Sequence, residues 1–447
     1  MYGWYRRISM SPIRRSTSYS GRSYDMTQLS PRHPPARTPT VSGAPDATTG
    51  VRFESGWVGN GTDVIECDPE LLAAVGPRVR KSPFFDATAR AGLTAVSTYN
   101  HMWLPMSYGD PDGEYLRLTT SVSMWDVAAQ RHVEITGPDA EPLVQLTTVV
   151  DVSRVATGHA RYAPIVGHDG TLLNDPVLLH WLDGTWRYSI ADSDVGLWIE
   201  AVARERGMNA RVRELDSATL AVQGPLAFDV LAALGLGWAS DLETSEMRPA
   251  TLDLDRRSVE VVVSRSGWSH QGGVELFLDD PTHAASLWDA VATAGEPFGI
   301  GPGTPNPTER IENVLLSYGT DTGYHANPIE LGLIDHLDLD GPDFIGRDAL
   351  CRIRDDGPAR RLRGAVIDDP KMDTLPHPVP FVTADGETVG ELRAGTSSPR
   401  FGRNIGLALV RSSCAVGSTG TVRLPDGERH VRLVELPFTE SLGEDDA

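Results

Sequence analysis

Two stretches of the sequence carry side chains whose types and spacing suit chemistry on a small ligand. The first, SRSGWSHQGGVELFL at residues 264–278, predicts a strand, a glycine-rich turn and a returning strand. Such a hairpin needs only a small polar turn, yet this one carries Trp268 near its tip and Glu275 on the returning strand. A bulky aromatic ring and a carboxylate exceed what such a turn requires. The hairpin is therefore a candidate binding element.

The second stretch, ARYAPIVGHDGTLLNDPVLLHW at residues 160–181, places a carboxylate within an apolar strand. GHDG predicts a turn, and Asp175 follows Asn174 among leucine and valine side chains. A carboxylate in apolar surroundings must find a partner or serve a function. From the residues alone, Asp175 is either a structural acid or a functional one.

A third stretch, GIGPGTPNPTERIENVLLSYG at residues 299–319, predicts a loop that leads into a helix. Its glycines do not match the GxGxxG spacing, and no acid follows at the distance that a dinucleotide site requires. Asn306 is expected to cap the helix, with Pro307 at its first position and Glu309 at its third, close to a capping box. Capping alone could explain Asn306 and Glu309.

No metal site is predicted. DHLDLDGPD lacks the ligand spacing of a calcium loop, and the twelve histidines form no HxxxH or HExxH pair. Cys67, Cys351 and Cys414 lie far apart without a CxxC pair, which argues against a disulfide framework or a zinc site. Three isolated cysteines are typical of a reducing compartment, so a cytoplasmic location is expected.

Composition excludes two classes of partner. The formal net charge of −21 argues against nucleic acid, and no apolar run approaches the roughly 18 residues of a membrane span. The first 42 residues differ from the rest, with seven arginines against one acid, Asp25, and no apolar period. We expect residues 1–50 to form a disordered N-terminal extension. A transit peptide or a start codon assigned too early would also explain this segment.

The remaining pattern predicts an α+β protein with two regions. In residues 51–360, strands at 131–137, 218–224 and 256–265 alternate with helices. One helix at 194–207 is expected to bury a face that includes Leu197, Trp198 and Val202. In residues 361–440 helical signals fade, and short strands with a PDGER turn predict a small all-β domain.

Taken together, these stretches resemble the folate-dependent one-carbon transferases related to the T-protein of the glycine cleavage system. The resemblance runs in order from about residue 95 to 436, through ARYAPIVGHDGTLLND, ATLAVQGP, SRSGWSHQGGVEL, RIENVLLSYG and TSSPRFGRNIGLALV. It implies an α+β, three-lobed fold with a central folate channel. Residues 51–360 would form two interleaved α+β lobes, and residues 361–440 a C-terminal antiparallel β-barrel.

Within this family the chain looks most like the dimethylsulfoniopropionate demethylase branch. TYNHMWLP, SMWDV, SIADSDV and PNPTERIENVLLSYG carry that likeness. T-proteins have TGE where this chain has Ser269-His270-Gln271, and an arginine where it has Asn306. The KGCYxGQE signature of the iron–sulfur-assembly branch is absent, which argues against a non-catalytic folate-binding role.

The resemblance also implies site residues, with tetrahydrofolate as the cofactor. Asp175 is the implied catalytic residue. The implied folate contacts are Tyr162, Glu275, Asn306 and Arg310, and the implied substrate contacts are Trp268, Tyr99, His101 and Phe277. Phe277 stands where the demethylases have tyrosine, a difference that could alter the donor site. His101 is equally interpretable as a buried structural histidine.

The expected reaction moves a methyl group from a small sulfonium, such as dimethylsulfoniopropionate, to N5 of tetrahydrofolate. The partner is then a small-molecule methyl donor, and the chain a monomer or homodimer. Folate-dependent O- or N-demethylation, or aminomethyl transfer, remains an alternative, as does a folate-binding protein without turnover. An ether or amine donor would need a proton donor at the leaving group, for which His101 and His270 are candidates.

Overall fold

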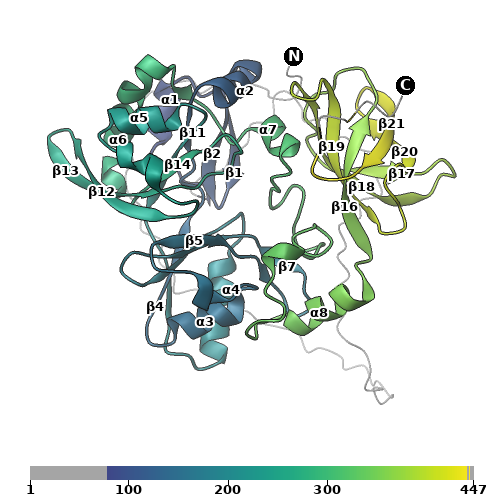
Figure 1. Ribbon diagram of the computed structural model, residues 1–447, viewed down its shortest axis with the longest axis horizontal. Coiled ribbons are helices and arrows are strands. Elements are labelled where there is room, and N and C mark those ends of the chain that lie inside the picture. Colours follow the sequence, from purple (N-terminus) through teal and green to yellow (C-terminus); the bar gives the residue numbers. More distant parts are fainter. Residues whose placement is uncertain (1–77, 440–441, 443–447) are drawn as a thin grey trace, which may run out of the picture. The chain divides into compact units, whose positions relative to one another are not determined.

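The computed structural model describes residues 78–439 and residue 442. The expectations for residues 1–50 and for Cys67 lie outside the described residues. Within them the fold is α+β, as predicted, with strands grouped into two larger sheets, two small hairpins and a barrel (Figure 1). The helices are α1 (Phe85–Arg90), α2 (Pro111–Thr120), α3 (Ala140–Thr147), α4 (Val195–Glu205), α5 (Ala227–Ala233), α6 (Ala284–Gly295), α7 (Pro307–Glu312) and α8 (Arg347–Asp356).

A six-stranded sheet carries the predicted hairpin. Its order is β12 (Met247–Leu254), β13 (Arg257–Ser264), β14 (Gly273–Leu278), β11 (Ala218–Gln223), β3 (Ser123–Asp126) and β15 (Gly301–Pro302). Leu220, Val222, Val274 and Leu276 belong to an apolar core that also includes α5 and α6 residues. Successive side chains of a strand point to opposite faces, so the intervening residues form a second face. On that face Ala221 pairs with both Trp125 and Glu275.

A five-stranded antiparallel sheet supplies the second set of site elements. Its order is β10 (Arg211–Glu214), β4 (His132–Thr136), β9 (Trp186–Ser189), β8 (Val177–His180) and β5 (His159–Tyr162). The small hairpins are β1 (Ala95–Tyr99) with β2 (Met102–Ser107), and β6 (Ile165–Val166) with β7 (Leu172–Asn174). Asp175 lies directly after β7, so the connection from β7 to β8 positions this carboxylate.

Helix α4 confirms the predicted helix but corrects its buried face. Its buried residues are Val195, Ile199 and Ala203, which recur every four residues along the helix. Trp198 and Val202 pack partly against the same core, whereas Leu197 is 69% exposed. Leu197 is two residues from Val195 and Ile199, about 200° around the helix from either, so the prediction that it is buried was wrong.

The C-terminal barrel is confirmed as a closed sheet of six strands, all paired antiparallel. Its order is β16 (Arg360–Ile367), β19 (Arg403–Arg411), β18 (Thr388–Ser398), β17 (Val379–Val382), β20 (Thr419–Leu424) and β21 (Gly427–Val434). Helix α7 contacts β18 and β19, and the Thr308 and Thr396 hydroxyls lie 3.0 Å apart. No helix among the described residues is long and apolar enough to cross a membrane.

His132 on β4 makes the folded protein sensitive to acid. It is fully buried beside Trp181 and Phe277, and neither ring nitrogen has a hydrogen-bond partner among the described residues. Burial lowers the pKa of His132 from 6.5 to about 4, with the Arg187 charge adding to the effect. The unfolded state therefore binds a proton first, and stability is lost as the pH falls from 6.5 towards 4.

We expect His132→Leu to remove this acid sensitivity. The wild-type free energy of unfolding should fall by roughly 3 kcal/mol more than that of the variant between pH 7 and pH 4. Urea denaturation at both pH values measures the difference. Exposed His430→Leu is the matched control and should leave the wild-type pH dependence unchanged. Equal pH dependence of His132→Leu and the wild-type protein would contradict the assignment.

Candidate functional site

The predicted hairpin forms, with the 265–272 loop connecting β13 to β14. Trp268 lies half-buried in this loop, and Glu275 is half-buried on β14, on the sheet face shared with Trp125. The Ser266 hydroxyl donates a hydrogen bond to Glu275 Oε2 at 2.5 Å. Burial raises the pKa of Glu275, and the Ser266 bond offsets part of the rise. The hairpin thus presents an aromatic ring and a carboxyl group from one continuous segment.

Gln223, at the end of β11, anchors one side of the loop. Its amide nitrogen donates to the carbonyls of Ser266 (3.1 Å) and Val274 (3.2 Å), and its amide oxygen accepts from Ser269 Oγ (2.7 Å). Gly267 has a φ of +154°, and a Cβ there would lie 2.1 Å from the Gln223 amide. Only glycine lets the loop approach Gln223 this closely.

Glu309, on α7, anchors the other side of the loop. Its Oε1 accepts from His270 N (3.0 Å), Gln271 Nε2 (3.0 Å) and Asn313 Nδ2 (2.8 Å). The predicted N-cap is confirmed, because Asn306 Oδ1 accepts from the Glu309 amide at 2.9 Å. The expected capping box is wrong in its second half, since the Glu309 side chain bonds the hairpin loop rather than the Asn306 amide.

Asp175 is half-buried within hydrogen-bonding reach of Tyr162, whose hydroxyl donates to Oδ2 at 3.3 Å. Burial raises the pKa of Asp175 from 3.8 to about 7; the Tyr162 hydrogen bond opposes the rise, and the Asp321 carboxylate adds to it. Asn174 fixes the backbone beside it, since its amide donates to Ala191 O at 3.0 Å and accepts from Ala191 N at 3.0 Å. A carboxyl group with this pKa exchanges a proton near neutral pH.

Three tyrosines gather around Asp175. Burial is the first cause that raises the pKa of Tyr99, Tyr162 and Tyr318, and the negative charge of Asp175 also raises each of them. The Tyr318 hydroxyl donates to Leu173 O at 2.6 Å, two residues before Asp175. The structure therefore groups the predicted Tyr99, Tyr162 and Asp175, and adds Tyr318 to them.

Arg310 joins the hairpin to the Asp175 region. It forms a buried ion pair with Asp321, whose side chain is fully enclosed and also accepts from Ser317 N at 2.9 Å. The Arg310 guanidinium lies 6.0 Å from the centre of the Trp268 ring. Because Asp321 also acts on the pKa of Asp175, these residues form one electrostatic cluster.

His101 and Phe277, two of the residues predicted to contact the methyl donor, have surroundings that differ from those of Trp268 and Asp175. His101 is exposed, and its Nε2 lies 3.1 Å from Asp194 Oδ2, so its interpretation as a buried histidine was wrong. Phe277 is 3% exposed and packs between His132, at 5.1 Å between ring centres, and Trp181, at 5.8 Å. A donor contact for either residue stays a prediction.

Sequence reasoning missed several of the residues that complete this site. Gln223 was detectable, because it is the one amide side chain in the largely apolar strand segment ATLAVQ. Asp321 gave no signal, since it follows SYGT in an irregular loop. Ser123 Oγ and Trp125 Nε1 are buried and have no hydrogen-bond partner within residues 78–439, on the sheet face that carries Glu275. Sequence reasoning missed these two residues because only the pairing of distant strands places them on the same sheet face as Glu275.

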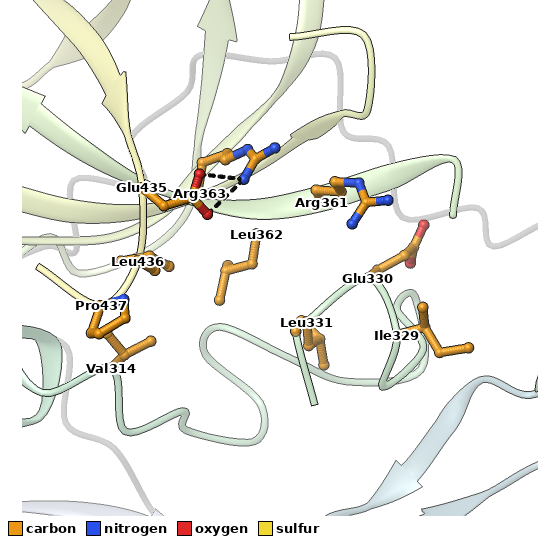
Figure 2. A pocket seen from close by; sticks show the side chains of 11 residues that line it. Val314, Ile329, Glu330, Leu331, Arg361, Leu362, Arg363, Glu435, Leu436 and Pro437 are labelled. Atoms are coloured by element: carbon orange, nitrogen blue, oxygen red, sulfur yellow. Dashed lines mark hydrogen bonds and ion pairs between the residues drawn. The ribbon is translucent and has the colours of Figure 1, made fainter. Parts of the chain in front are cut away.

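A surface hollow of about 370 Å³ is lined by a different set of residues (Figure 2). Arg363 on β16 bonds Glu435 across one wall at 3.1 and 3.2 Å. The other lining residues are Val314, Ile329, Glu330, Leu331, Gly332, Arg361, Leu362, Leu436 and Pro437. None of the predicted site residues lines this hollow, so it is not the candidate active site.

Comparison with known proteins assigns the chain to a family. Residues 84–340 match the GCVT N-terminal domain, and residues 360–440 match the glycine cleavage T-protein C-terminal barrel domain. The chain belongs to the glycine cleavage T-protein family. It is a folate-dependent one-carbon transferase of that family, whose members use tetrahydrofolate as a cosubstrate.

Relatives of this family match nearly their whole length. Dimethylsulfoniopropionate demethylase DmdA of Ruegeria pomeroyi is 36% identical over 370 residues, which cover 81% of this chain and 99% of the relative. An aminomethyltransferase of Symbiobacterium thermophilum is 30% identical over 383 residues, or 81% and 98% of the two chains. The glycine cleavage aminomethyltransferase of Bartonella henselae shares the fold, with a TM-score of 0.71 at 20% identity over 81% and 98% of the chains.

Proposed function

We propose that this enzyme transfers a methyl group from a small cationic donor, of the dimethylsulfoniopropionate type, to N5 of tetrahydrofolate. The observation that carries the proposal is the position of Trp268 in a region rich in carboxyl groups. The acids of this cluster are Glu309, Asp321 and Asp175, and the Arg310 guanidinium beside Trp268 is paired with Asp321. An aromatic face with negative charge nearby favours a cation.

The residues present suit a folate. Glu275 has a half-buried carboxyl group that can accept N–H bonds from a pterin. Trp125 Nε1 and Ser123 Oγ, on the same sheet face, can donate to ring acceptors. Tyr162 adds a phenol beside Asp175. Tetrahydrofolate supplies the nitrogen that accepts the methyl group.

Methyl transfer from a sulfonium does not require a catalytic acid at the leaving group. When the C–S bond of a sulfonium breaks, sulfur keeps the electron pair and leaves as a neutral thioether, so no proton donor is needed there. Both histidines considered for that role, His101 and His270, are exposed, which fits a leaving group without a proton requirement. On the acceptor side, Asp175 can take the proton that N5 loses, because its pKa of about 7 suits exchange at neutral pH.

The test is formation of 5-methyltetrahydrofolate from tetrahydrofolate and dimethylsulfoniopropionate under anaerobic conditions, followed by liquid chromatography. We expect product from the wild-type protein and a roughly 30-fold lower kcat/KM for Trp268→Leu, the loss of about 2 kcal/mol of cation binding. Trp238→Leu serves as a matched tryptophan control outside the described cluster. Product from a methyl ether, a methylamine or an aminomethyl-loaded lipoyl carrier protein, but not from the sulfonium, would favour the alternative donors instead.

A further inference from the structure

The second carboxylate oxygen of Glu309 has no explained role in the fold. Glu309 is 1% exposed, and its Oε1 accepts three hydrogen bonds, whereas Oε2 has no partner among the residues that the structure describes. An unpaired buried oxygen destabilises the folded state, and more strongly if it is charged. An apolar side chain would avoid this cost, so the oxygen is a candidate ligand group.

The Glu309 side chain contacts the loop that carries Trp268. Glu309 Oε1 lies 3.0 Å from His270 N and 3.0 Å from Gln271 Nε2, and both residues follow Trp268 within the same loop. The neighbouring Arg310 on α7 places its guanidinium 6.0 Å from the Trp268 ring. The carboxylate and the aromatic face are therefore held in one unit by the hairpin and the helix.

Glu309 brings a carboxylate to this part of the site. Arg310 is paired with Asp321, so their opposite charges largely cancel. Every hydrogen bond that the Glu309 side chain accepts in the described part of the chain comes from an uncharged donor, namely a backbone amide and the side-chain amides of Gln271 and Asn313. These bonds hold the carboxylate in place without neutralising it.

We propose that Glu309 supplies the counter-charge that makes the Trp268 site select a cation over a neutral group of the same shape. Glu309 is then a specificity-determining residue for the methyl donor, acting through the charge of its carboxylate. The inference rests on the proposed function in taking Trp268 as the donor site.

The decisive variant is Glu309→Gln, which keeps an amide oxygen for the three donors but removes the charge. Binding is measured by calorimetry without folate, using dimethylsulfoniopropionate and 4-methylpentanoate, in which a CH group replaces the sulfonium. We expect the wild-type protein to prefer the sulfonium at least ~10-fold, and Glu309→Gln to lose most of that preference by weakening sulfonium binding alone. Affinity for tetrahydrofolate should stay within about twofold.

Gln271→Met is the matched control, because it removes one hydrogen bond to Glu309 but leaves the charge. It should retain the preference for the sulfonium. Equal weakening of both ligands in Glu309→Gln would show a structural role and overturn the inference. The inference would also be overturned if the wild-type protein bound both ligands equally, or bound neither. This second test uses the wild-type protein alone, so it does not depend on whether the variants fold.

The outcome is separable from that of the proposed function. Methyl-folate formation without a cation preference would leave the function standing and reject the role of Glu309. A cation preference that Glu309→Gln abolishes, in a protein that forms no methyl-folate, would support Glu309 and reject the methyl transfer.

Discussion

Replacing Asp175 by asparagine is expected to slow turnover strongly and, at the same time, to stabilise the folded protein. The folded-state pKa of Asp175 is raised from 3.8 to about 7. A raised pKa means that the carboxyl group favours folding below pH 3.8 and loses that contribution as the pH rises towards 7. At pH 8 the buried charge costs roughly 4 kcal/mol as an upper value, which asparagine would not carry. Asparagine still accepts the Tyr162 hydrogen bond but takes no proton.

Two measurements check this expectation. The kcat/KM for methyl-folate formation should fall about 10²–10³-fold in Asp175→Asn, and in the wild-type protein it should rise with pH through about 7. The melting temperature of the variant should exceed that of the wild-type protein at pH 8, by a margin that shrinks at pH 5. Asp183→Asn, at an exposed turn, is the control and should leave turnover unchanged. Full activity in Asp175→Asn would rule out its catalytic role.

Removal of Asp321 should produce the largest loss of stability among single substitutions at this site. Asp321 is fully enclosed and pairs with Arg310, which is itself only 7% exposed. Truncation to alanine leaves a buried guanidinium without its counter-ion and the Ser317 amide without its acceptor. Breaking such a buried pair costs about 3–5 kcal/mol. Urea denaturation of Asp321→Ala at neutral pH measures this difference.

The double variant Arg310→Met/Asp321→Ala distinguishes the cost of leaving one charge unpaired from the cost of lost packing around the pair. Without either charge no unpaired ion is buried, so most of the loss should be recovered. The exposed pair of Glu200 and Arg204 provides the comparison, since Glu200→Ala should cost less than about 1 kcal/mol. A similarly small effect of Asp321→Ala would mean that the Arg310 charge finds other partners.

Local signals in the sequence were sufficient for much of the fold. The N-cap at Asn306 depends on a side chain and an amide three residues apart, and the hairpin around Trp268 depends on adjacent strands. Short strands and turns in residues 361–440 predicted an all-β domain, family resemblance implied that it is a barrel, and the closure of that barrel is confirmed. Family resemblance, rather than periodicity, implied that Tyr162, Asp175 and Tyr99 belong together, and the structure groups them.

The features of the site that could not be predicted from the sequence depend on contacts between segments that are distant along the chain. The pairing of Asp321 with Arg310 needs an irregular loop to fold back on α7, for which no periodic pattern exists. Glu309 matched the third position of a capping box, but its carboxylate instead accepts two hydrogen bonds from the hairpin loop and one from Asn313. Leu197 fitted an apolar stripe by composition, yet the core lies on the other side of α4.

The two anchors of the 265–272 loop bear on how donor preference can be transplanted between relatives. Gln223 precedes the loop by more than forty residues, and Glu309 follows it by a similar stretch, yet both bond the loop directly. A chimaera that exchanges the loop alone would carry the tryptophan without the Gln223 and Glu309 side chains that hold the loop in place. Donor preference in this scaffold therefore depends on three separate segments: the 265–272 loop and the segments that contain Gln223 and Glu309. A change of donor preference requires all three segments to change together.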